Sequence, residues 1–262
     1  MNSRERVLAA LNHEEPDRVP IDLGGTRQSG IAASAYHQLK ERLGLATPTR
    51  AFDLYQMLAE VEEPVLDRFG ADVVHLNRPV VAFGIRNEDW KPWRLMDGTP
   101  VEVPGDFNPT ADDNGNLLLC DPDAGPIARM PKDGFYFDRL DVYPGAAHAD
   151  PDTLELPLLT DEECDHLAAG AEAYRQTSQR AVVVQMGPPY ELFFGLGTGD
   201  FSAWMMTLAT EPDYVRSLYE KLVETWLANL PLLYEAVGDR VDVLQFNDDL
   251  GTEYGPFLSV DM

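Results

Sequence analysis

The sequence predicts an α/β fold with parallel strands. Short apolar runs of strand length alternate along the chain with longer segments whose apolar residues recur at helical spacing. Loops of special composition, rich in glycine or in acidic residues, follow several of these apolar runs. Strands and helices that alternate in this way are typical of a parallel sheet with its functional loops after the strands.

The composition limits the classes of protein to which the chain belongs. Its 262 residues are 44% hydrophobic and 25% charged, which suits a globular fold. A net charge of −25 argues against nucleic acid and anionic membranes as partners. No apolar run approaches the roughly 20 residues that span a bilayer, and the N-terminus lacks a signal peptide's apolar core, so we expect a cytoplasmic protein. Cys120 and Cys164 lie far apart in the sequence, which predicts two unpaired thiols.

The first 76 residues predict a regular alternation of helices and strands, which we take as the first part of the fold. Glycines placed after apolar segments mark helix ends, because glycine accepts the left-handed backbone there. The expected helices are 3–12, Ala32–Leu43 and Leu54–Phe69, and the expected strands are Val19–Asp22, Thr49–Asp53 and Ala71–Leu76.

Four polar side chains stand at or just after these strands. Asp22 and Asp53 end their strands, and Arg27 lies in a glycine-rich loop that lets the backbone bend sharply towards a ligand. Arg27 is either a substrate-binding residue or a surface charge. His75 is either a ligand or acid–base group, or a hydrogen-bonded residue of the core.

Residues 77–147 predict an antiparallel β-hairpin insertion. Asp97-Gly98, Asn114-Gly115 and Asp133-Gly134 are dipeptides that favour tight hairpin turns, since both residues tolerate positive φ. The insertion is also rich in aromatic residues, which either pack the hairpins or close over a ligand. These aromatic residues are Trp90, Trp93, Phe135, Tyr136 and Phe137.

From 148 to 262 the alternation resumes. Thr160 to Glu163 form a capping-box pattern that predicts a helix to about Ser178. A strand at Ala181–Met186 leads into a loop at 187–199 whose prolines, glycines and aromatics, Tyr190 among them, suit the wall of an apolar pocket. A short helix after Asp200 and a long one from Thr210 to Gly238, kinked at Pro231, precede the last strand.

The last strand begins at Val241 and leads into Asp248 and Asp249. Neighbouring residues in a strand point to opposite faces, so both acids face one pocket only if the strand has already ended. We expect one to be a site residue and the other a loop cap; the alternative is two acids on a solvated turn. We count about five strands where a (β/α)8 barrel needs eight. The count, with a helix N-cap pattern at Ser259, suggests a fragment of a longer protein.

Several segments resemble the uroporphyrinogen decarboxylase superfamily. They are Ser3-Arg-Glu-Arg-Val-Leu-Ala-Ala-Leu-Asn-His-Glu-Glu-Pro-Asp-Arg-Val-Pro-Ile-Asp22, Val183-Val-Gln-Met-Gly-Pro-Pro189, Phe246-Asn-Asp-Asp-Leu-Gly251 and Gly255-Pro-Phe-Leu-Ser259. The resemblance implies a (β/α)8 barrel of the TIM type, here incomplete, with residues 1–76 and 148–262 as the barrel and 77–147 as the insertion. It also implies an enzyme, either a cofactor-free decarboxylase of haem biosynthesis or a zinc-dependent corrinoid or thiol methyltransferase.

The loop after the first expected strand favours the methyltransferase-like branch. The decarboxylases carry several arginines there to bind the many carboxylates of a porphyrin precursor, whereas Gly24–Gly30 holds Arg27 alone. The resemblance implies methyl transfer from a small methylated compound; the alternatives are tetrapyrrole decarboxylation and an inactive fragment or binding protein.

The resemblance also implies site residues and cofactors. Asp248 or Asp249 would orient or protonate the reacting group. The expected substrate-binding residues are Asp22, Arg27, Asp53, His75, Tyr190 and Asn247. The zinc motif of that branch, His-x-Cys, does not occur in these residues, so we expect no metal ligands within them. Zinc and a corrinoid protein partner are expectations for the full-length protein.

Overall fold

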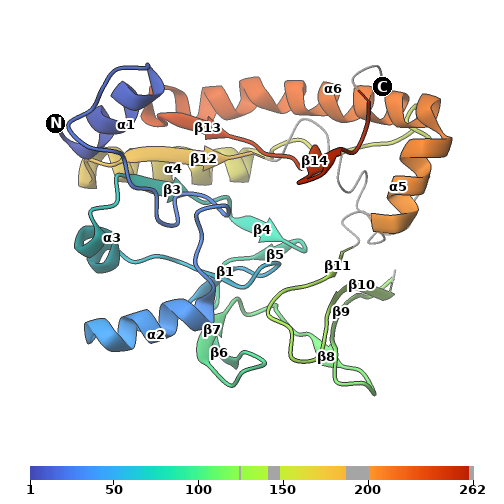
Figure 1. Cartoon of the computed structure of the whole chain (residues 1–262), viewed down its shortest axis with the longest axis horizontal. Coiled ribbons are helices and arrows are strands. Elements are labelled where there is room, and N and C mark those ends of the chain that lie inside the picture. Colours follow the sequence, from blue (N-terminus) through green and yellow to red (C-terminus); the bar gives the residue numbers. More distant parts are fainter. Residues whose placement is uncertain (124, 141–147, 187–200, 260–262) are drawn as a thin grey trace.

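The computed structural model is a mixed α/β fold (Figure 1). It describes residues 1–123, 125–140, 148–186 and 201–259. The helices of this part are α1 (Ser3–Leu11), α2 (Ala33–Leu43), α3 (Glu63–Phe69), α4 (Asp161–Thr177), α5 (Phe201–Thr210), α6 (Pro212–Val237) and the 3-10 helix η1 (Gly238–Arg240). The strands are β1 (Ala51–Asp53), β2 (Leu58–Ala59), β3 (Val73–Leu76), β4 (Val80–Ala82), β5 (Ile85–Arg86), β6 (Lys91–Arg94), β7 (Pro100–Val103), β8 (Thr110–Ala111), β9 (Leu117–Asp121), β10 (Gly125–Met130), β11 (Arg139–Leu140), β12 (Ala181–Gln185), β13 (Val243–Gln245), β14 (Gly251–Thr252) and β15 (Gly255–Pro256).

A parallel sheet joins segments that are far apart in the sequence. Its order is β13-β12-β3, and Val183 of β12 pairs with His75 on one side and Val243 on the other. Among the described residues this sheet has three strands instead of the expected five, and no sheet closes into a barrel. Residues 19–22 form no strand, and β1 pairs antiparallel with β2. The parallel arrangement itself is confirmed.

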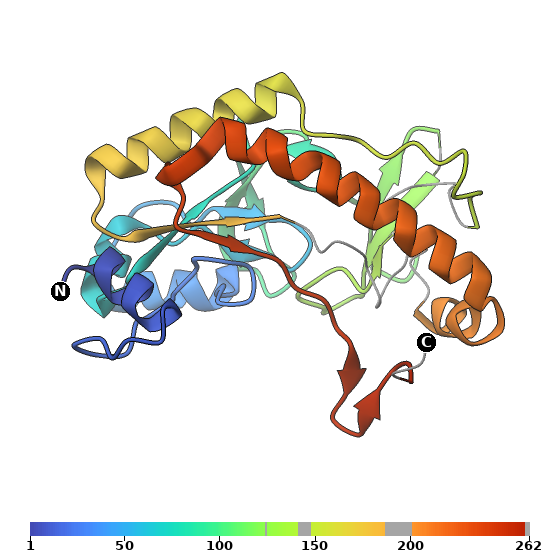
Figure 2. The same ribbon diagram turned by 90° about the horizontal axis from the view of Figure 1, so that it is seen from above.

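Two helices cover one face of the parallel sheet. Side chains alternate between the faces of a strand, so every second residue of β3 and β12 points the same way. The side chains of Leu76 and Val184 pack with Leu167 of α4 and Leu233 of α6 in one buried cluster. Figure 2 shows both helices on one side of the strands. Helix α6 runs through Pro231 without interruption.

The opposite face is apolar at one end and polar at the other. Near the amino ends of the strands, Val73 and Val183 pack with Val7 of α1. Towards the carboxyl ends, the same face carries His75, which pairs with Val183, and Gln185, which pairs with Gln245. The polar residues therefore gather at the carboxyl edge, where loops from several strands meet.

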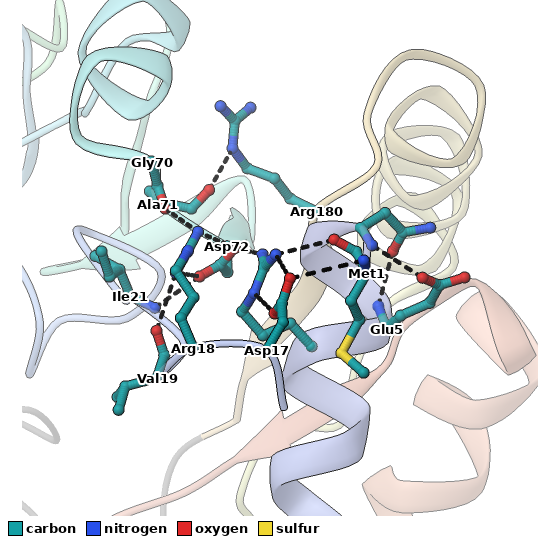
Figure 3. A network of polar contacts seen from close by, with 12 residues as sticks. Met1, Glu5, Asp17, Arg18, Val19, Ile21, Gly70, Ala71, Asp72 and Arg180 are labelled. Carbon is teal, nitrogen blue, oxygen red and sulfur yellow. Dashed lines mark hydrogen bonds and ion pairs between the residues drawn. The ribbon is translucent and has the colours of Figure 1, made fainter. Parts of the chain in front are cut away.

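Buried aspartates fix the amino edge of the sheet. Asp72, next to the start of β3, has a fully buried side chain and accepts hydrogen bonds from Arg6 at 2.7 Å and from Arg18 at 2.6 and 3.0 Å. It also accepts the Ile21 N–H at 2.8 Å. Figure 3 shows the guanidinium of Arg18 beside Asp72, below Gly70.

A second aspartate repeats the arrangement at β13. The side chain of Asp242 is 2% exposed and accepts hydrogen bonds from Arg4 at 2.7 Å and Arg175 at 2.9 Å. Its other oxygen accepts the Val182 N–H at 2.9 Å. Because Arg4 and Arg6 belong to α1, that helix joins the starts of β3 and β13.

The segment 54–69 corrects one prediction. The expected helix is replaced by a turn, strand β2 and the short helix α3. Asp53 accepts the N–H of Gln56 at 2.8 Å, which closes the turn, and Pro64 stands in the first turn of α3, where its missing N–H costs nothing. The expected helix ends at Gly44 and Gly70 are confirmed, both in the left-handed region.

The insertion is antiparallel, as predicted. Strands β4 to β11 pair antiparallel with one another, and one isolated parallel bridge joins Glu102 of β7 to Arg50. Phe107 and Phe137 are buried in a core that also contains Tyr36 of α2. Phe135 and Tyr136 are more than half exposed. The division of the chain into segments at 77 and 147 stays a prediction. No helix in the described part is long and apolar enough to cross a membrane.

We predict that Asp72→Asn destabilises the fold by about 3 kcal/mol or more, because it leaves the charges of Arg6 and Arg18 without their buried carboxylate. Burial alone would raise the pKa of Asp72, but the hydrogen bonds from Arg18, Ile21, Ser3 and Arg6 hold it below the ordinary value of 3.8. The stabilisation should therefore be complete above about pH 4 and lost as the pH falls further. Urea unfolding across this range measures it.

The matched control is Glu162→Gln, which removes an exposed carboxylate paired with Arg86 at 2.7 Å. Exposed ion pairs contribute about 0–1 kcal/mol, so this variant should unfold almost like the original protein. Equal unfolding free energies for the two variants would contradict the role assigned to Asp72.

Candidate functional site

The carboxyl edge of the parallel sheet brings together three of the residues expected at a site. Arg27 comes from the glycine-rich loop 23–30, Asp53 from the end of β1, and His75 from β3. The loop lies close against the sheet, because a Cβ added at Gly25 would come within 2.4 Å of Val73 Cγ2. Glycine is thus required there for the backbone to approach β3.

Arg27 and Asp53 form an ion pair. Arg27 Nε lies 2.5 Å from Asp53 Oδ2, and the carboxylate is fully buried while the arginine side chain is 29% exposed. The contact is an ion pair and not an aligned hydrogen bond. The guanidinium carbon also lies 5.8 Å from the centre of the Tyr55 ring. A buried carboxylate needs a cation, so Asp53 holds Arg27 in one orientation.

His75 is electrically neutral at physiological pH. Burial, and next the positive charge of Arg27, lower its pKa from 6.5 to about 4. Its ring meets the ring of Phe52 edge to face, with centroids 5.9 Å apart. The Nδ1 atom is buried and has no hydrogen-bond partner among the described residues. A neutral imidazole in this position can form a hydrogen bond with a bound molecule, as acceptor or donor according to its tautomer.

Four carboxamides, three of them absent from the predicted site, complete the edge. Gln28 Oε1 lies 3.2 Å from Gln185 Nε2 and 3.3 Å from Gln245 Nε2, and Gln185 Nε2 donates to Asn247 Oδ1 at 2.9 Å. The sequence does contain a signal, since a glutamine stands near the end of each apolar run, at Gln185 and at Gln245. Only the register of the sheet shows that these glutamines are neighbours.

The predicted site residues also include Asp22, Asp248 and Asp249, and each takes part in a local hydrogen bond. Asp22 is exposed and accepts the Gly25 N–H at 2.8 Å, which shapes the loop. Asp248 is half-buried and accepts the N–H of the exposed Asp249 at 2.8 Å. This difference fits one site acid and one loop residue, although their roles stay predictions. Tyr190 lies outside the described residues.

No three His, Cys, Asp or Glu side chains of the described ranges are grouped so that they could hold a metal ion. Cys120 and Cys164 are both free thiols, as expected. A hollow of about 400 Å³, including space open to solvent, lies between α2 and the insertion. Its walls are mainly apolar, among them Met57, Trp93 and Phe107, so it offers little chemistry compared with the sheet edge.

Comparisons of the chain with protein-family models, with curated proteins and with solved structures find no match.

We predict that Arg27→Gln raises the pKa of His75 above about 4, because the substitution removes the neighbouring positive charge. Burial is the larger cause, so the pKa should remain below the ordinary value of 6.5. NMR titration of the imidazole measures the change. Arg50→Gln is the control, since Arg50 lies elsewhere, beside Glu102 and Trp90, and should leave the titration of His75 unaltered. An unchanged pKa in Arg27→Gln would contradict the assigned proximity.

Proposed function

We propose that this protein is an enzyme of the uroporphyrinogen decarboxylase type that transfers a methyl group from a small methylated compound to a thiol or corrinoid acceptor. The observation that carries the proposal is the gathering of Arg27, Asp53 and His75 at the carboxyl edge of a parallel sheet. In (β/α)8 barrels the active site lies at this edge. The barrel itself, of which β3, β12 and β13 would form part, belongs to the proposal.

The polar groups support a small substrate. Arg27 is held by Asp53 and offers its remaining N–H groups to an anionic group of the substrate. A porphyrin precursor carries many carboxylates, and a single arginine in a chain of net charge −25 is a poor match for it. Tetrapyrrole decarboxylation is therefore the second candidate, in which Arg27 binds one carboxylate and an acid stabilises a protonated pyrrole.

The proposed step needs proton transfer at both ends. The methyl carbon forms a bond to the acceptor sulfur while its bond to the donor atom breaks, and the electron pair of that bond stays on the donor atom. The thiol loses its proton to solvent, and the neutral imidazole of His75, a weak base with a pKa of about 4, orients the thiol through a hydrogen bond. The donor atom gains a proton, which we assign to Asp248. Asp249, Asp22, Asn247 and Tyr190 remain in the proposal as supporting residues.

The residues described do not fit the zinc ion that the resemblance implies. Zinc in such sites is bound by several His, Cys or carboxylate side chains, and these residues form no such group. No step above passes through a metal. Zinc and a corrinoid protein partner stay expectations for the full-length protein, and the cytoplasmic location stays a prediction.

We predict that Arg27→Gln lowers kcat/KM for demethylation by about 100-fold, because the substrate loses its charged partner. The assay offers methylated amines, ethers and thioethers as methyl donors, and a thiol or a reduced corrinoid as the acceptor. Arg27→Lys keeps the charge that Asp53 needs but loses the planar fork, so it should stay folded and show an intermediate loss.

Arg216→Gln, on the exposed surface of α6, is the control and should keep full activity. If no donor is demethylated, or if Arg27→Gln is fully active, the proposal is wrong. Release of carbon dioxide from a tetrapyrrole without methyl transfer would support the second candidate.

A further inference from the structure

The carboxamides at the sheet edge leave oxygen atoms without donors. Gln28 Oε1 faces the Nε2 atoms of both Gln185 and Gln245. Each glutamine thus directs its nitrogen at Gln28 and its oxygen elsewhere. The Oε1 atoms of Gln185 and Gln245 are buried and have no hydrogen-bond partner in the described part of the chain.

Such unpaired oxygens are costly. Leaving a buried acceptor without a donor costs about 1–3 kcal/mol, so most native proteins avoid it. Gln185 and Gln245 are neighbours in register on adjacent strands, so together they offer two acceptor atoms. His75 Nδ1, on the same face, adds another unpartnered polar atom. An incoming group with N–H donors would satisfy these atoms.

Arg27, which directly precedes Gln28 in the sequence, provides hydrogen-bond donors and a positive charge. Its Nε is held by Asp53, and no hydrogen bond from its terminal nitrogens to a described residue is seen. These nitrogens form the flat fork that binds carboxylates in a bidentate manner. The edge of the sheet thus combines an anion-binding group with a pair of neutral acceptors.

We infer that the ligand of this edge is a small zwitterion, whose carboxylate binds Arg27 and whose protonated amine donates N–H bonds to Gln185 and Gln245. The inference rests on the proposed function and names the substrate class of the same site. A quaternary ammonium group has no N–H and leaves both oxygens unpaired. A carboxylic acid without an amine also leaves both glutamine oxygens unpaired. Sites built to hydrogen-bond a polar group strongly reject analogues that lack it.

Binding of three probes to the full chain tests this inference. N,N-dimethylglycine carries one N–H, which the two glutamine oxygens can share in a bifurcated hydrogen bond. Betaine differs by one methyl group and carries no N–H, and acetate lacks the amine. Calorimetry or ligand NMR should show dimethylglycine binding at least about tenfold more tightly than betaine or acetate, the equivalent of one good hydrogen bond.

Variants then locate the effect. Gln185→Met and Gln245→Met keep the side-chain length but remove the amide, and each should reduce the advantage of dimethylglycine over acetate while acetate still binds. Gln176→Met, on the exposed surface of α4, is the matched control and should change nothing. Thermal melts of each variant separate loss of binding from loss of folding.

The outcomes distinguish this inference from the proposed function. If the three probes bind equally and their binding requires Arg27, the inference of a zwitterionic ligand is wrong, but the proposed enzyme function is not contradicted. Dimethylglycine binding that needs both glutamines, without any methyl transfer, supports the inference and contradicts the proposed reaction. Absence of binding by every probe, or an advantage that survives both Met substitutions, overturns the inference.

Discussion

The fold depends on charge pairing at the amino edge of the parallel sheet. Asp72 and Asp242 stand at the starts of β3 and β13 with their carboxylates almost fully buried. A buried carboxylate is tolerated only with a cation and further donors, and α1 supplies one arginine to each. Helix α1 must therefore lie across this edge, which aligns strands separated by more than 160 residues of sequence. The same alignment brings the opposite ends of the strands together.

The two edges of the sheet differ in how completely their polar atoms are paired. At the amino edge, both oxygens of Asp72 and of Asp242 accept hydrogen bonds. At the carboxyl edge, Gln185 and Gln245 keep an oxygen each without a partner among the described residues. Full pairing stabilises a fold, whereas unpaired buried atoms prepare a site for a ligand. On this contrast rests our proposal that one edge stabilises the fold and the other recognises a ligand.

Local patterns predicted the elements, but not the partners that complete the site. Helical spacing and glycine caps located α2, and the apolar run 181–186 located β12, because these signals lie within a few residues. The prediction of one helix over 54–69 was wrong, because the same apolar spacing also suits a turn, a strand and a short helix. The pairing of this segment with β1 selects the strand. Arg27, Asp53 and His75 were predicted as polar residues near strand ends. The glutamine pair was not, since it exists only through the register of β12 and β13.

Long-range charge and local charge act differently on a ligand of this site. The net charge of −25 repels any anion that approaches from solvent, although salt screens this field beyond about 8–10 Å. Within the site, Asp53 already balances Arg27, so the pair adds no net positive charge to offset the repulsion. A simple acid would approach against the field and find little compensation. A zwitterion has no net charge, meets no such barrier, and can still use the oriented N–H groups of Arg27 once it has entered.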